Sequence, residues 1–268
     1  MRGAVLAALF CVIAVPVWAD ARVTVLMDAL RLPQLVQSLR AEGMADADDL
    51  NADMLNGQGG AFWSQQVSRL YDTGPMEDTF YRALADGLDD TALDVALQFF
   101  DSARGQRITE LEIAARDAMR EPSVEETAAA AYDALAADNP YAELVSRFIA
   151  LNDLLELNVA LTMSSSYQFS RGLADGGLLE MTDDQILAQV WESEQGLRED
   201  AETWLRGYFY LAQQPLDIAD LEAYVAFADS PAGADLNAAL FAGYEAIFTD
   251  IAYGLGRAVA MNAAGNDI

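Results

Sequence analysis

The 268-residue sequence contains no histidine and no lysine, and its single cysteine is Cys11. Histidine is the most common general base, lysine forms Schiff bases, and cysteine supplies a nucleophile or a zinc ligand. These absences remove most of the residues used in acid–base catalysis, nucleophilic catalysis and zinc binding. No glycine-rich loop follows a strand pattern, so phosphate-loop and dinucleotide-binding motifs are missing too. The sequence therefore predicts no catalytic residue, no cofactor-binding residue and no metal site.

Positive charge is also scarce. The chain has 15 basic residues, all of them arginine, against 43 acidic residues, and its net charge is −28. Nucleic acids and anionic lipid surfaces are bound by cationic patches, so this balance argues against both as partners. A strongly acidic surface keeps a protein soluble. We interpret the composition as a solvated acidic surface, compatible with a salty environment or a GC-rich genome.

The first 19 residues have the pattern of a secretory signal peptide. Arg2 supplies the positive charge, residues 4–17 form an apolar run, and Val17-Trp18-Ala19 resembles a cleavage site with small flanking residues. The run is too short to be a convincing membrane span. We expect cleavage near Ala19 and a periplasmic or secreted mature chain that is not an integral membrane protein. Cleavage would remove Cys11, leaving no disulfide and no free thiol.

One stretch occurs twice in the chain. Residues 88–105 read LDDTALDVALQFFDSARG, and residues 216–233 read LDIADLEAYVAFADSPAG. A constant shift of 128 residues aligns the two copies without a gap, and the same shift places Trp63 on Trp191. Apolar residues spaced by four and seven positions favour a helix in each copy. The sequence therefore predicts a duplicated unit in which a helix, a sharp corner and a second helix follow one another.

Each copy carries a serine and a glycine at the predicted corner. Ser102 and Ser230 are placed to cap the second helix by accepting from a free backbone N–H. A nucleophilic role is disfavoured because the chain has no histidine or lysine to act as their base. Gly105 and Gly233 lie three residues further on, inside the first turn, where glycine costs about 1 kcal/mol relative to alanine. Their presence at both positions predicts a close approach of another backbone.

A helix that ends in an aromatic residue, then Asp-Ser-x-x-Gly, then a long helix, resembles the bacterial exported family known as domain of unknown function 2059. The resemblance depends on Phe99, Ser102 and Gly105 in the first copy and on Phe227, Ser230, Pro231 and Gly233 in the second. It covers about one helical hairpin in each half of the chain. It implies an exported helical protein and brings no known activity with it.

The remaining chain also reads as helices, without an alternating strand pattern of useful length. Asp138-Asn139-Pro140 marks a boundary, with Asn139 as a helix cap and Pro140 at the first helical position. We predict an all-α multi-helix bundle built from two similar halves in tandem. The expected divisions are a signal peptide at 1–19, a first repeat unit at 20–138 and a second at 139–268, packed together as one domain.

Local signals predict where several helices begin, end or break. Pro33 is expected to kink or divide a helix over 23–42. A short acid-rich helix is expected to begin near Asp46, and a long helix to run from Pro140 through Met163 and beyond. Gly172 and Gly176-Gly177 are expected to end that helix. The final helix is expected to have about 30 residues and, being apolar nearly all round, to lie centrally.

Side-chain spacing predicts three polar pairs. Ser123 with Glu126, and Thr182 with Gln185, each have the spacing of a capping box, in which two side chains satisfy the backbone N–H groups at a helix start. Glu112 and Arg116 have the i, i+4 spacing of a favourable ion pair, which we expect on the outside of a helix.

Two polar segments have partial features of a ligand site. Asp49, Asn51 and Asp53 begin like a calcium loop, but Met54 stands where the loop needs glycine and Gly60 where it needs glutamate. A helix is therefore preferred there. The segment from Ser164 to Tyr167 is unusually polar and could line a pocket, although such a cluster is more often a solvated face or a weak point in a helix.

Three functional hypotheses follow. The leading one is a non-enzymatic interaction or structural module of the cell envelope, whose partner, an unknown envelope protein, would bind a groove between the halves. An alternative is a carrier or sensor of an apolar ligand or lipid, since helical layers readily enclose apolar cavities. Four aromatic residues motivate it: Trp63, Trp191, Tyr208 and Phe209. A second alternative is a carboxylate-based envelope hydrolase, which needs two acidic residues about 5–10 Å apart in one cleft.

Overall fold

The computed structural model describes residues 17–136 and 138–266, and within them it confirms the all-α class, because no strand is present. Most of the predicted signal peptide lies outside the described residues. The first helices are α1 (Val17–Ala29), α2 (Leu32–Leu55), α3 (Gly60–Leu70), α4 (Thr73–Gly87), α5 (Asp90–Phe100), α6 (Ala103–Met119) and α7 (Pro122–Asp133). The later ones are α8 (Pro140–Leu151), α9 (Leu154–Asp175), α10 (Asp183–Glu192), α11 (Glu194–Gln213), α12 (Ile218–Ala228) and α13 (Pro231–Asn266).

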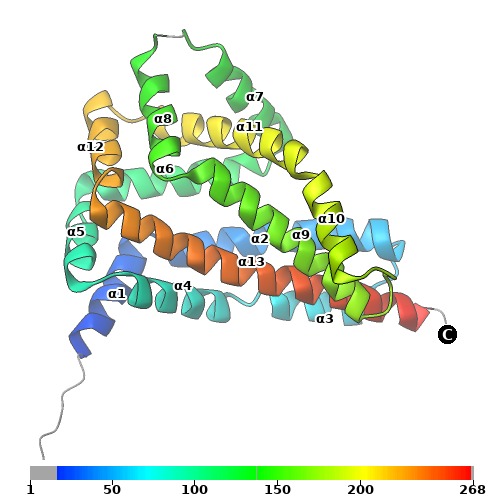
Figure 1. Cartoon of the computed structure of the whole chain (residues 1–268). Coiled ribbons are helices and arrows are strands. Elements are labelled where there is room, and N and C mark those ends of the chain that lie inside the picture. Colours follow the sequence, from blue (N-terminus) through cyan, green and yellow to red (C-terminus); the bar gives the residue numbers. More distant parts are fainter. Residues whose placement is uncertain (1–16, 137, 267–268) are drawn as a thin grey trace, which may run out of the picture.

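The last helix, α13, runs through the middle of the molecule, as predicted, and is 36 residues long (Figure 1). It packs against α3, α4 and α5 of the first half and against α9 and α12 of the second. Above it in the figure, α11 packs against α6, α7, α8 and α9. Helices from the two sequence halves are therefore interleaved.

Most buried apolar side chains of both halves belong to one hydrophobic cluster. Phe80 and Leu84 of α4 are fully buried in it, as are Leu221 of α12 and Val259 of α13. Each fully buried side chain of this size contributes about 1.5–3 kcal/mol relative to exposure to water. The apolar stripes that the sequence predicts on these helices thus meet in a shared core.

Helices α9 and α13 touch backbone to backbone at Gly172 and Gly256. A methyl group on Gly256 would lie 2.1 Å from the carbonyl oxygen of Phe169, and one on Gly172 would lie 2.3 Å from that of Tyr253. Neither distance leaves room for a carbon atom. Gly172 does not end its helix as predicted, because it serves a close helix contact inside α9, which continues to Asp175. The prediction is confirmed for Gly176-Gly177, since Gly176 caps the end of α9 and Gly177 follows it with φ of 83°.

The two predicted corners have the same local structure. Ser102 and Ser230 each accept a hydrogen bond from the backbone N–H of the glycine three residues later, at 3.1 Å in both cases. A methyl group on Gly105 would lie 2.3 Å from the carbonyl oxygen of Phe99, and one on Gly233 would lie 2.2 Å from that of Phe227. The predicted caps and close backbone contacts are confirmed.

Beyond the corner the two copies differ. The helix that follows Ser102 has 17 residues, whereas the helix that follows Ser230 has 36. A tandem of two similar halves therefore stays a prediction outside residues 88–105 and 216–233.

Near the N-terminus, the predicted division at Pro33 is confirmed. Arg31 adopts a left-handed conformation, with φ of 54°, between α1 and α2, and Pro33 lies in the first turn of α2. The separate helix expected to begin near Asp46 is wrong. No proline or glycine turn interrupts the chain there, so α2 continues through this position to Leu55.

The predicted long helix from Pro140 is also wrong in one respect, because it breaks between α8 and α9. Asp153 takes a left-handed conformation there, with φ of 51°. The side-chain amide of Asn152 donates to the carbonyl oxygen of Phe148, and the carbonyl of Asn152 accepts from Asn237 of α13, both at 2.9 Å. A tertiary hydrogen bond from α13 therefore satisfies the backbone at the break.

The cap predictions have mixed outcomes. Asn139 caps α8 by accepting from the N–H of Tyr141, and the capping box of Thr182 and Gln185 is present at the start of α10. The capping box predicted for Ser123 and Glu126 is wrong. Helix α7 begins at Pro122, two residues earlier than that box requires, because proline favours the first helical turn.

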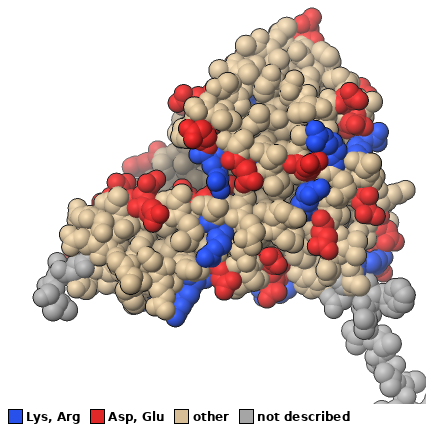
Figure 2. Space-filling model, turned by 180° about the vertical axis from the view of Figure 1, so that it is seen from behind, with Lys and Arg blue, Asp and Glu red and all other residues tan. Residues whose placement is uncertain are grey.

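Acidic and basic side chains both lie on the surface of the protein. Acidic side chains are spread over the face seen in Figure 2, with arginines set among them. Many of the arginines form ion pairs between helices, such as Arg104 with Asp220 and Arg147 with Asp229. Among the described helices, none combines the length and the hydropathy that a membrane crossing requires.

We expect Gly233→Leu to lower the free energy of unfolding by about 2–4 kcal/mol, because its side chain would collide with the backbone of Phe227. Gly196→Ala in α11 is the control, since nothing lies within 4 Å of its added methyl group. Urea denaturation measures both. A Gly233→Leu protein as stable as the Gly196→Ala protein would contradict the close contact.

Ser230→Ala should cost about 1 kcal/mol, the usual loss of a helix cap, and should leave the fold intact. The same denaturation experiment tests it. A loss much larger than that would show that the serine does more than cap α13.

Candidate ligand-binding site

A cavity of about 540 Å³ lies at the centre of the molecule, between α2, α6, α9, α11, α12 and α13. Its walls are mainly aromatic and aliphatic. The aromatic lining residues are Phe100, Phe148, Trp204, Tyr208, Phe209, Tyr224, Phe227, Phe241, Tyr244 and Phe248. Small-molecule sites usually have volumes of about 300–1,000 Å³ and apolar walls with a few polar groups. The cavity has the size and lining of such a site.

The aromatic walls are held in place by their own contacts. Trp204 stacks on Tyr208 with ring centres 4.8 Å apart, and Phe148 lies 4.5 Å from Tyr224 by the same measure. Phe99 and Phe227, which occupy equivalent positions in the two corners, stack at 4.6 Å. Such pairs contribute about 0.5–1.5 kcal/mol each beyond their burial. The aromatic side chains of the cavity wall are therefore packed against one another before any ligand enters.

One carboxylate, Glu112 of α6, lies in this aromatic wall. The hydroxyl of Tyr224 donates to its Oε1 at 2.9 Å, and the hydroxyl of Tyr208 donates to its main-chain oxygen at 3.2 Å. None of the ion pairs formed by the described residues includes Glu112. Its remaining accessible surface borders the cavity, so it is enclosed by protein although it is not fully covered.

Burial raises the pKa of Glu112 from its ordinary value of 4.5 to about 7, while the hydrogen bond from Tyr224 acts in the opposite direction. Burial also raises the pKa values of Tyr208, Tyr224 and Tyr244, so their hydroxyls stay protonated at neutral pH. The polar end of the cavity, as the term is used below, is Glu112 together with the hydroxyls of Tyr208, Tyr224 and Tyr244, and its carboxyl group changes charge near pH 7.

Arg116 lies one turn after Glu112 and also lines the cavity. Its partner is Glu42 of α2, with Nε 2.9 Å from Oε1 and Nη2 2.6 Å from Oε2. The predicted surface pair between Glu112 and Arg116 is therefore wrong, since both residues point inward and bind other groups. Spacing of i, i+4 makes two side chains neighbours on a helix, but the surrounding helices decide whether that face meets water.

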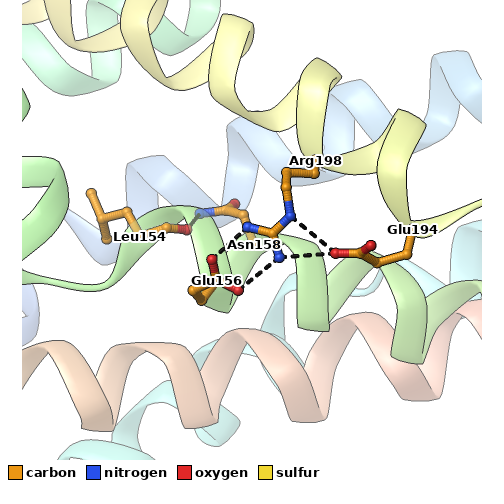
Figure 3. A network of polar contacts seen from close by, with 5 residues as sticks. All are labelled: Leu154, Glu156, Asn158, Glu194 and Arg198. Atoms are coloured by element: carbon orange, nitrogen blue, oxygen red, sulfur yellow. Dashed lines mark hydrogen bonds and ion pairs between the residues drawn. The ribbon is translucent and has the colours of Figure 1, made fainter. Parts of the chain in front are cut away.

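An ion-pair network fixes the α9 wall of the cavity to α11 (Figure 3). Arg198 reaches across from α11 and donates to both carboxylate oxygens of Glu156, and it also pairs with Glu194 on its own helix. Within α9, Asn158 donates to the carbonyl oxygen of Leu154 at 2.7 Å, and both of these residues line the cavity. The hydrogen bonds from Arg198 lower the pKa of Glu156, so the network stays charged at neutral pH.

The polar segment that begins at Ser164 remains helical inside α9, and Ser165 lines the cavity. Thr162, one turn earlier on the same wall, is both exposed and part of the lining. The rim of the cavity therefore passes through this part of α9, and the pocket interpretation of the segment holds for Ser165.

Two of the four aromatic residues that motivated an apolar ligand, Tyr208 and Phe209, line the cavity. Trp63 is buried in the core without lining it, and Trp191 is 62% exposed on α10. Sequence reasoning missed Glu112 as a cavity residue. The available signal was its position four residues after Ile108, which is fully buried on the same helix.

The calcium-like residues do not gather. Asp49, Asn51 and Asp53 lie within α2, where Asn51 accepts from the N–H of Gly59 at 2.9 Å. In the part of the chain that the structure describes, no three histidine, cysteine or acidic residues are arranged to hold a metal ion.

No family model, no curated protein and no solved structure matched this chain in the comparisons made. The resemblance to domain of unknown function 2059 accordingly depends on the two corner motifs alone.

The raised pKa of Glu112 predicts a pH-dependent stability. The folded protein holds this proton more tightly than the unfolded chain. The resulting contribution to the free energy of unfolding is fully present below about pH 4.5 and is lost as the pH rises through 7. The loss amounts to up to about 3 kcal/mol.

Glu112→Gln keeps an acceptor for Tyr224 but cannot ionise. We expect urea denaturation to show that wild-type protein loses stability relative to Glu112→Gln protein between about pH 5 and about pH 8. The other acidic groups contribute equally to the pH dependence of both proteins, so their effect cancels when the two free energies of unfolding are subtracted. A difference that is constant with pH would mean that Glu112 ionises freely.

Proposed function

We propose that this chain binds an amphipathic small molecule in the central cavity and acts as a carrier or sensor of that ligand. The observation that carries the proposal is an aromatic cavity of about 540 Å³ with the carboxyl group of Glu112 in its wall. An apolar body would lie against the aromatic wall, and a polar group would face the carboxyl and tyrosine hydroxyl groups.

The energetics are sufficient for useful affinity. Each 100 Å² of apolar ligand surface removed from water contributes about 2.5 kcal/mol. Several hundred square ångströms of ligand surface would therefore offset the loss of free motion on binding, which costs at least about 4 kcal/mol. Because the wall is held by stacked pairs such as Trp204 with Tyr208, little additional ordering is needed. A dissociation constant in the micromolar range is the reasonable expectation.

The other two hypotheses have less support. An interaction module would bind its partner in a groove between the halves, and the hollow that both sequence halves border has the volume of a small-molecule site. A glycoside hydrolase mechanism uses two carboxyl groups, and the described residues that line the cavity include one, Glu112. The predicted signal peptide would place ligand binding in the cell envelope.

The uncharged dye Nile red should bind the purified protein with about one site per chain, and Leu161→Trp should weaken its binding at least about tenfold. Leu161 lines the cavity from α9, and a larger side chain there would occupy ligand space. Leu187→Trp is the matched control, because Leu187 is exposed on α10 and does not line the cavity.

Dye titration followed by fluorescence gives the affinities, and thermal melts check that both variants fold. Equal weakening in both variants, or unchanged binding in Leu161→Trp, would place the dye elsewhere and contradict the proposal. Native mass spectrometry of protein from its own source would then show whether a natural ligand co-purifies.

A further inference from the structure

The polar end of the cavity has one negative group without a cationic partner. Glu112 makes no ion pair with the described residues, and its hydrogen-bonding partners are the neutral hydroxyls of Tyr208 and Tyr224. A carboxylate placed in an apolar wall loses the water that would otherwise stabilise its charge. An ionised Glu112 therefore favours any ligand that supplies a positive charge.

The groups around Glu112 do not supply that charge themselves. On its own helix, Arg116 forms an ion pair with Glu42 of α2 through two hydrogen bonds, and the two charges cancel. Helices α11, α12 and α13 contribute the hydroxyls of Tyr208, Tyr224 and Tyr244, which are neutral. Helix α9 contributes only neutral groups, from Asn158, Thr162 and Ser165. Taken together, the polar end carries a charge of −1 when Glu112 is ionised.

The surrounding rings add a second preference for a cation. Tyr208 and Tyr224, whose hydroxyls donate to Glu112, line the same cavity, as does Trp204, which stacks on Tyr208. The faces of aromatic rings attract cations, and quaternary ammonium groups are recognised by aromatic side chains of this kind. Carboxylate and rings therefore favour the same class of ligand group.

We propose that the cavity selects amphipathic ligands with a cationic amine or quaternary ammonium group, which binds beside Glu112 as its counter-ion. The inference rests on the proposed function, because it specifies the ligand of the same cavity. An anionic head group would be repelled by the carboxylate unless Glu112 took up a proton. A neutral alcohol would gain a hydrogen bond but no charge pairing.

This arrangement links binding to pH. Glu112 is the counter-ion only when it is ionised, and its pKa in the free protein is about 7. About a tenth of the carboxyl groups are ionised at one pH unit below that value and about nine tenths at one unit above it. A permanently charged ligand should therefore bind about tenfold more tightly at pH 8 than at pH 6, with release of a proton at the lower pH.

The test compares three ligands with one alkyl chain and different head groups: decyltrimethylammonium, 1-decanol and decanoate, all below their aggregation concentrations. Isothermal titration calorimetry at about pH 6 and about pH 8 gives the affinities, and two buffers of different ionisation enthalpy reveal the proton released. We expect the cation to bind more tightly than the alcohol at the higher pH, and decanoate to bind less tightly there than at the lower pH.

Glu112→Gln is the matched variant, because it removes the charge and keeps the size of the side chain. Its affinity for decyltrimethylammonium should fall about tenfold at the higher pH and lose its pH dependence, whereas its affinity for the uncharged 1-decanol should change by much less than tenfold. Wild-type protein that binds the alcohol as tightly as the cation would overturn the inference and leave the proposed function standing. Absence of binding by all three ligands and by Nile red would overturn both.

Discussion

The backbone contact between α9 and α13 is the constraint on which the remaining packing depends. At Gly172 and Gly256 the two helices approach so closely that an added methyl group would overlap a carbonyl oxygen. Elsewhere on α13, the side chain of Phe80 from α4 packs against Gly243 and that of Leu70 from α3 packs against Gly254. Because α13 contacts both sequence halves, displacement at any of these glycines would shift helices on every side of it.

Helices α9 and α13 form two walls of the cavity, and specific contacts hold them together. They run in parallel, with one contact at Gly172 and Gly256 and another where Asn237 donates to the carbonyl of Asn152. Most lining residues of both helices lie between these two contacts, from Leu154 onward in α9 and up to Phe248 in α13, whereas Gly233 and Leu236 precede Asn237. Arg198 adds a third attachment from α11. These contacts fix the relative positions of the helices that form two walls of the cavity.

Burying the carboxyl group of Glu112 in the aromatic cavity wall costs free energy. Its carboxyl group is enclosed by aromatic rings and lacks a cationic partner among the described side chains. Natural proteins accept such local conflicts mainly where a site needs them, and strongly shifted carboxyl groups are concentrated at functional sites. The neighbouring pair of Arg116 and Glu42 shows the contrast, because there each buried charge is matched within the protein. The ion pair of Arg116 with Glu42 has no net charge, so the charge at the polar end of the cavity is that of the ionised Glu112.

The sequence by itself determined the features that depend on neighbouring residues. The helical class, the caps at Ser102, Ser230 and Thr182, and the tight corners at Gly105 and Gly233 follow from side chains that act on their own backbone. Such interactions are complete within about one turn, so spacing alone is enough to predict them.

Only the tertiary structure decided the features that depend on distant partners. The break before Asp153 is satisfied by Asn237, the role of Gly172 is defined by Gly256, and the inward direction of Glu112 is set by Tyr208 and Tyr224. The helical period does not say which face of α6 other helices will cover, so Glu112 and Arg116 were assigned to the surface. The cavity was beyond sequence reasoning for the same reason, because its walls come from helices far apart in the chain.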